Sequence, residues 1–253
     1  MAGYQISAAP FGGEDAILGV MDLTQSGLPS LVYSTYFGGS RNDAVSSLAL
    51  DPSGNAVISG YTISLDLPVT PDAVQPTYGG DTDAWVAVIN PNLPFQQGLV
   101  YSTYLGGSGG DAGTWASADA AGNLWVAGYT LSPDFPLANA VQGSWPGGID
   151  LFVTGIKRGV AGHAGLIMSS YVGGATTYTA TSVAMDTGGN LFVTGYGGVG
   201  LPTSPASAQG GFAGGINDGF VLVIGTSAGT QPAVTAVPAR NRRPSGEHLP
   251  HPR

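Results

Sequence analysis

The chain of 253 residues contains no cysteine, which excludes a disulfide framework, a cysteine-based zinc finger and a thiol nucleophile. Basic side chains are almost as scarce: up to residue 229 only Arg41, Lys157 and Arg158 stand against fifteen acidic residues. An acidic body of this kind offers no basic surface for nucleic-acid phosphates. No run of 18 apolar residues occurs, so we predict no membrane span.

Glycine and apolar residues are abundant instead. The chain holds 42 Gly and 18 Pro, yet 43% of its residues are hydrophobic. A disordered chain lacks such apolar surface, so the composition favours short apolar strands separated by many glycine- and proline-containing turns.

Three sequence landmarks recur in the same order at offsets of 68 and 67 residues. The first is LVYSTYFGGS at Leu31, LVYSTYLGGS at Leu99 and LIMSSYVGGA at Leu166. The second is DPSGN at Asp51, DAAGN at Asp119 and DTGGN at Asp186. The third is GGEDAILGVM at Gly12, GGDTDAWVAVI at Gly79, GGIDLFVTGI at Gly147 and GGINDGFVLVI at Gly214. Fixed spacing of this kind marks a repeat architecture; we divide the chain into a partial unit 1–30, full units 31–98, 99–165 and 166–229, and a tail 230–253.

Each unit resolves into four short strands. In the first full unit they are residues 31–37, 43–51, 55–62 and 83–90, rich in Val, Tyr, Thr and Ile and bounded by Gly, Pro, Asn or Asp. The stretch WVAVI at Trp85 is apolar on both faces, which is typical of a sheet covered above and below. Four strands repeated at a fixed period predict the blades of an all-β propeller.

Aspartates recur at two positions of the unit, and we predict them to be structural turn anchors. One group opens the tight hairpin between the second and third strands: Asp51, Asp119 and Asp186. The other precedes the last strand: Asp15, Asp83, Asp150 and Asp218. An Asp side chain accepts hydrogen bonds from backbone groups near it. A residue that recurs once in every blade is expected to stabilise the blade itself.

The combination YSTYLGG, a D-x-x-G-N hairpin with GYT, S-x-D-[FL]-P and GG-x-DAWVAV resembles the bacterial SBBP repeat, a β-propeller family. The third element stands here at Ser64–Pro68 and Ser132–Pro136. The resemblance covers roughly residues 4–229 and implies an exported or surface bacterial protein, hence an extracellular or cell-surface location. Residues 1–20 lack the basic start and apolar stretch of a signal peptide, so we expect an export signal to lie upstream. The third unit departs from the pattern, because Tyr178 replaces the acidic residue found at Asp43 and Asp111.

The predicted strands are too few for a closed ring. Thirteen strands fall short of four complete four-stranded blades, the usual minimum for a propeller. We therefore predict an incomplete, open arc of about three blades plus part of a fourth, in a fragment of a larger protein. Open sheet edges template further pairing, so self-association is expected. The tail 230–253 has no strand pattern and is predicted to be disordered; His248 and His251 within it are not taken as metal ligands.

Any binding surface is predicted on the face of the arc that carries the long loop 63–82 and its counterparts, because loops on a rigid scaffold usually carry binding. The candidate residues on this face are Tyr78, Trp145, Phe212, Asp43 and Asp111. The two aspartates are expected at the entrance of the central channel. They either cap their own loops or form part of a carboxylate ring for Ca²⁺.

No catalytic residue is predicted. The body holds a single histidine, His163, and no acid or nucleophile stands at a readable spacing from it. The leading hypothesis is a non-enzymatic structural or interaction module with no cofactor, whose partner is a protein or a glycan. A carbohydrate-binding or carbohydrate-active propeller and a calcium-stabilised module remain as alternatives.

Overall fold

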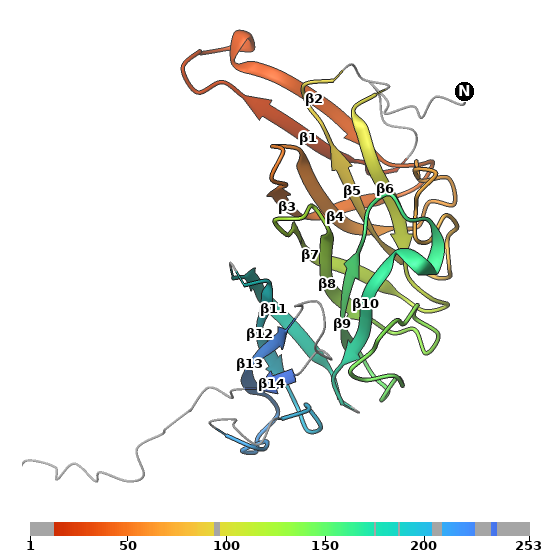
Figure 1. Ribbon diagram of the computed structural model, residues 1–253, viewed down its shortest axis with the longest axis vertical. Helices are drawn as coiled ribbons and strands as arrows, with labels where there is room; N and C mark the ends of the chain where they lie inside the picture. Colours follow the sequence, from red (N-terminus) through yellow and green to blue (C-terminus); the bar gives the residue numbers. More distant parts are fainter. Residues whose placement is uncertain are drawn as a thin grey trace, which may run out of the picture.

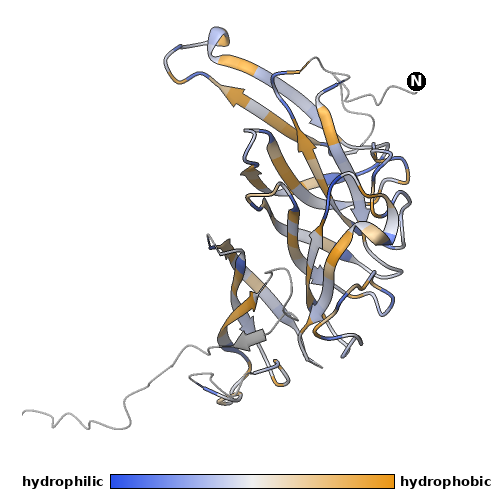
Figure 2. Cartoon of the chain, in the orientation of Figure 1, coloured by the Kyte–Doolittle hydropathy of each residue, from blue (hydrophilic) through white to orange (hydrophobic). Residues whose placement is uncertain are grey.

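The computed structural model describes residues 13–93, 97–174, 176–186, 188–203, 209–225 and 234–236. These residues form four antiparallel sheets that follow one another along the chain in an open arc (Figure 1). Apolar residues concentrate on the strands, whereas the connecting loops are more polar (Figure 2). The predicted fold class is confirmed: the chain is all-β, built from propeller-like blades, and not closed. Among the described residues no helix is long and apolar enough to cross a membrane.

The first sheet pairs β1 (Ala16–Met21) with β2 (Leu31–Phe37), and a short 3-10 turn, Leu28–Ser30, precedes β2. The second sheet has the order β3-β4-β5-β6. Its strands are β3 (Asp43–Leu50), β4 (Ala56–Thr62), β5 (Asp83–Ile89) and β6 (Leu99–Leu105).

The third sheet has the order β7-β8-β9-β10, with β7 (Asp111–Ala118), β8 (Leu124–Thr130), β9 (Asp150–Ile156) and β10 (Leu166–Val172). A second 3-10 turn, Gly162–Gly165, lies before β10. The fourth sheet has the order β11-β12-β13-β14, with β11 (Tyr178–Met185), β12 (Asn190–Gly197), β13 (Asp218–Gly225) and β14 (Val234–Ala236).

The boundaries of the sheets differ from those of the sequence units. We expected each unit to form one sheet, and this is wrong: the LVYSTY strand that opens a unit completes the preceding sheet. Strand β6, from unit 99–165, pairs with β5 of unit 31–98, with Ala87 opposite Ser102. Strand β2 pairs with β1 in the same way. Each of these pairings joins two successive units, so neighbouring repeats are linked by strand exchange as well as by packing.

The tail prediction is wrong for one short segment. Val234–Ala236 forms β14, which pairs with β13 through Leu222 opposite Ala236. It occupies the position that β6 and β10 hold in their sheets. A strand of three residues is too short to show a recognisable alternation of apolar and polar side chains. It forms here because it pairs with the backbone of β13. The remaining tail residues, His248 and His251 included, lie outside the described residues.

The core consists of the junctions between successive sheets. We call the side of a sheet that meets the preceding sheet its leading face, and the opposite side its trailing face. In the second sheet Trp85, Ala87 and Ile89 lie on the leading face, against Ala16 and Leu18 of the first sheet.

The next junction has the same arrangement. Val86 and Val88 on the trailing face of the second sheet pack against Phe152 and Ile156 of the third. Trp125 and Val153 of the third sheet in turn pack against Phe220, Leu222 and Ile224 of the fourth. Burial on both faces explains why these strands are apolar throughout rather than alternating.

Candidate functional site

The hairpin aspartates bind their own turns. Asp51 Oδ1 accepts hydrogen bonds from the backbone N–H groups of Ser53 and Asn55, both at 2.9 Å, and Oδ2 accepts one from the Asn55 amide at 2.9 Å. Asp119 and Asp186 repeat this geometry with Asn123 and Asn190. The carboxylate thus satisfies the backbone donors of a tight turn, which is the role of a turn anchor.

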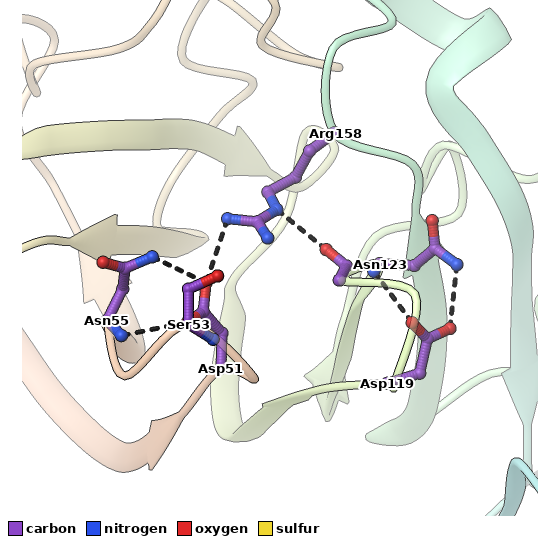
Figure 3. A network of polar contacts seen from close by, with 7 residues as sticks. Asp51, Ser53, Asn55, Asp119, Asn123 and Arg158 are labelled. Carbon is purple, nitrogen blue, oxygen red and sulfur yellow. Dashed lines mark hydrogen bonds and ion pairs between the residues drawn. The ribbon is translucent and has the colours of Figure 1, made fainter.

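Arg158 ties two of these hairpins together (Figure 3). Its guanidinium lies 3.3 Å from the buried Asp51 carboxylate and donates a 2.8 Å hydrogen bond to the Gly122 carbonyl. Burial raises the pKa of Asp51, but the hydrogen bonds from Asn55 and Ser53 and the Arg158 charge outweigh it and leave the pKa below its ordinary value. Arg158 therefore links the second and third sheets on the hairpin side of the arc.

On the opposite side, Asp43 and Asp111 each hold a glycine loop. Asp43 Oδ2 accepts hydrogen bonds from the Gly39 N–H at 2.7 Å and from the Ser64 hydroxyl at 2.9 Å, and Thr62 donates to Oδ1. Asp111 accepts the matching bonds from Gly107 and Ser132. Both side chains are buried, and their bonds to Gly39 and Gly107 are the loop caps that the sequence offered as one of two alternatives.

The S-x-D motif completes this loop clamp. Ser64 accepts a hydrogen bond from the Arg41 N–H at 2.8 Å. Asp66 accepts two from Ser40, through its N–H at 2.8 Å and its hydroxyl at 2.9 Å. Ser132, Asp134 and Ser108 repeat these contacts in the next blade. The S-x-D motif therefore has a structural role: its side chains bind the backbone of the loop that precedes the inner strand.

The aspartates before the last strand lie beside the inner-strand aspartates of the next blade. A Cβ placed on Gly106 would lie 2.7 Å from Asp83 Oδ1 and 2.8 Å from Asp111 Oδ2. On Gly38 it would lie 2.5 Å from Asp15 Oδ1 and 2.7 Å from Asp43 Oδ2. Each of the first two junctions therefore brings two carboxylates around one glycine that has no room for a side chain.

Burial raises the pKa of three of these acids, Asp43, Asp83 and Asp111. Burial raises the pKa of Asp83 to about 7, although the Gly79 N–H bonded to it opposes the rise and the neighbouring Asp111 charge adds to it. The pKa values of Asp43 and Asp111 are raised for the same principal reason. Asp83 Oδ1 is buried and has no hydrogen-bond partner among the described residues, which favours the neutral form.

The third junction replaces this carboxylate pair by an acid and an aromatic ring. Tyr178 occupies the inner-strand position of Asp43 and Asp111, and its hydroxyl donates to the Gly198 carbonyl at 2.9 Å. A Cβ on Gly173 would collide with Asp150 and lie 3.3 Å from the Tyr178 ring. Burial alone raises the pKa of Asp150 to about 7. The last of the four aspartates, Asp218, accepts a 2.5 Å hydrogen bond from the Ala213 N–H.

Sequence reasoning assigned no role to two side chains that hold the long loops. The Tyr104 hydroxyl donates to the Ser64 carbonyl and accepts from the Leu67 N–H, both at 2.8 Å. Tyr171 makes the equivalent contacts with Ser132 and Phe135. The recurring second tyrosine of the YSTY landmark was the available signal.

The three predicted aromatics lie in different surroundings. Tyr78 packs edge-on against Tyr104, with ring centroids 6.0 Å apart, and donates a hydrogen bond to the Asp81 carbonyl. Trp145 packs against the core between the second and third sheets. Phe212 lines a cavity of about 200 Å³ in the fourth sheet, together with Tyr178 and Phe220. They do not converge on one site.

The described residues contain no group of three or more His, Asp or Glu side chains that could hold a metal ion. His163 lies in the turn before β10, and its Nε2 is 2.7 Å from the Leu137 carbonyl. This histidine thus contacts the backbone of the neighbouring loop.

Comparison with known proteins agrees with the repeat. Residues 32–68 match the family model described as a β-propeller repeat, SBBP. No curated protein matches the chain. Among solved structures, the chain is similar to the hydrazine synthase of Kuenenia stuttgartiensis, at 16% identity and a TM-score of 0.40. That alignment covers 88% of this chain and 60% of the other.

The family match begins in β2, crosses the Asp51 hairpin and ends at Pro68, after the S-x-D motif. It therefore includes Asp43, Asp51 and Ser64, whose hydrogen bonds hold the loop and hairpin of the second sheet. Residues 32–68 thus carry the SBBP β-propeller repeat.

Proposed function

We propose that the chain is a non-enzymatic structural or interaction module. The observation that carries this proposal is the engagement of the recurring polar side chains within the blades. Asp43, Asp51, Ser64 and Asp66, with their counterparts in the next blade, bind backbone groups of loops and hairpins. Residues used in this way position a scaffold, and the loops they hold are the surface available to a partner.

The proposed binding surface is the long-loop side of the arc. Tyr104 and Tyr171 fix the loops after β4 and β8 by paired hydrogen bonds. A loop held in this way loses little conformational entropy on binding. Its partner is a protein or a glycan.

Binding of carbohydrate is a second candidate, favoured by the cavity at Phe212. Three aromatic side chains, Tyr178, Phe212 and Phe220, line this cavity of about 200 Å³. Concave sites with aromatic walls are typical of small-ligand binding.

A glycan array and a panel of chromogenic glycosides test both candidates. The module proposal predicts no turnover of any glycoside, and hydrolysis would contradict it. If a glycan binds through the cavity, Phe212→Ala should abolish the signal. Tyr78→Phe is the matched control, since it removes only the hydroxyl bonded to Asp81 and should bind as the parent chain does.

The calcium-stabilised alternative is tested by thermal unfolding with and without a chelator. A midpoint that falls when calcium is removed would support it, and an unchanged midpoint would eliminate it. We also propose an extracellular or cell-surface location, supported by the resemblance to SBBP repeat proteins. Protease treatment of intact cells tests this: the native protein should be cleaved without lysis, and protection would refute the proposal.

A further inference from the structure

Every internal junction of the arc joins the same two surfaces. The leading face of one sheet packs on the trailing face of the sheet before it, and the residues involved are equivalent from one unit to the next. Trp85, Phe152 and Phe220 occupy one repeat position on the leading face, and all three are buried. Ile89, Ile156 and Ile224, on the same face, are also buried. The junction is therefore a head-to-tail contact made three times within the chain.

The first sheet exposes its leading face. Ile17 stands at the position of Trp85, but its side chain is 63% exposed whereas that of Trp85 is 0%. Met21 stands at the position of Ile89 and is 60% exposed. Gly19 lies between them on the strand and is also exposed. Strand β1 thus presents an apolar stripe without a charged side chain.

The fourth sheet exposes the opposite, trailing face. Phe192 in β12 is 37% exposed, whereas the equivalent Trp125 is 2% exposed and packs in a junction. Val221 and Val223 in β13 are half-buried, although Val86 and Val88 at the same positions are fully buried. The two ends of the arc (Figure 1) therefore carry the two halves of the contact that the chain makes internally.

We propose that the leading face of one chain binds the trailing face of a second copy. The interface continues the established junction: Ile17 and Met21 of one copy take the places that Phe220 and Ile224 occupy within the chain, and Phe192 of the other copy takes the place of Trp125. Such a contact is heterologous, so it produces a ring if the rotation closes and an open chain if it does not. The proposal concerns the ends of the arc and is independent of what the long loops bind.

Two single variants of the full chain test the proposal. Ile17→Asp places a charge on the leading face, and Phe192→Asp places one on the trailing face. Each variant keeps one intact end, so each alone should be monomeric in sedimentation-velocity experiments at concentrations where the parent chain associates. The expected weakening is on the order of a hundredfold for an apolar anchor at an interface centre. An equimolar mixture should form heterodimers that grow no further, because each partner has only one working face.

Leu65→Asp is the matched control, since Leu65 is 62% exposed but lies on a long loop away from both end faces. It should associate as the parent chain does. Urea unfolding of all three variants should match that of the parent, because the substituted side chains are solvent-exposed. A parent chain that remains monomeric overturns the proposal, as does association that survives in either single variant. A mixture that stays monomeric also overturns it.

Discussion

Gly106 is one of the residues at which the junction geometry excludes a side chain. A Cβ at this position would lie within 2.8 Å of one oxygen of the Asp83 carboxylate and one of the Asp111 carboxylate. Both acids are buried, and each accepts a backbone hydrogen bond, Asp83 from Gly79 and Asp111 from Gly107. Gly106→Ala must therefore displace a carboxylate that other groups hold in place.

The cost has two sources. Overpacking a filled interior costs about 1–3 kcal/mol, and loss of a hydrogen bond to a charged group adds about 1.5–3 kcal/mol if the carboxylate moves away from its donor. We expect Gly106→Ala to lower the free energy of unfolding by about 2.5–6 kcal/mol if both costs apply. This corresponds to a fall of roughly 5–25 °C in the melting temperature.

Urea unfolding followed by circular dichroism measures the effect. Gly143→Ala is the control, because a Cβ there meets no atom within 4 Å and its φ is not in the left-handed region; it should change stability by less than about 0.5 kcal/mol. Combining Gly106→Ala with Asp83→Ala should recover part of the loss, because the second change removes one of the clashing groups. Equal stabilities for Gly106→Ala and the control would refute the reasoning.

Three further predictions concern titration, the hairpin bridge and the loop clamp. A carboxyl whose folded pKa lies above its unfolded value contributes stability that is fully present below about pH 4 and is lost as pH rises to about 7, so the free energy of unfolding should fall between about pH 4 and 7. The slope is at most about 1.4 kcal/mol per pH unit for each group. Asp83→Asn and Asp150→Asn should each flatten this fall, and an unchanged slope in both would contradict the assigned pKa values of about 7. Arg158→Ala leaves a buried carboxylate without its cation and should cost about 1–3 kcal/mol in urea unfolding, whereas the exposed Lys157→Ala should be neutral; similar losses for the two would argue against the bridge. Tyr104→Phe removes a hydroxyl that binds two buried backbone groups and should cost about 1–3 kcal/mol with faster amide exchange at Leu67, and unchanged exchange there would count against the clamp.

The repeat, the strands and the class of fold could be predicted from the sequence because their signals are local. A blade strand hidden on both faces is apolar throughout, as Trp85–Ile89 is. The hairpin at Asp51 depends on groups within five residues of one another, so its turn chemistry is visible in the sequence.

The partition of strands into sheets could not be predicted in this way. The LVYSTY strand is equally compatible with the strand before it and the strand after it, and only pairing of β6 with β5 decides the matter. The burial of Asp43 depends on Ser64 and Thr62, from another strand and the loop that follows it. The sequence could not decide whether Asp43 caps its loop or faces a channel, because an acid hydrogen-bonded by its own blade looks the same in sequence as an exposed one.

The central claim is that the first strand of each unit completes the sheet of the unit before it. The chain has no cysteine, so an engineered pair reports on pairing without interference. Gly19 in β1 and Ser34 in β2 lie opposite each other and are both exposed, at a separation typical of cross-strand disulfides. Mild oxidation of dilute Gly19→Cys/Ser34→Cys protein should form an intramolecular disulfide rapidly, whereas Ser34→Cys/Ser46→Cys, which joins β2 to β3 of its own unit, should remain reduced. Cross-linking of the second pair but not the first would contradict the claim.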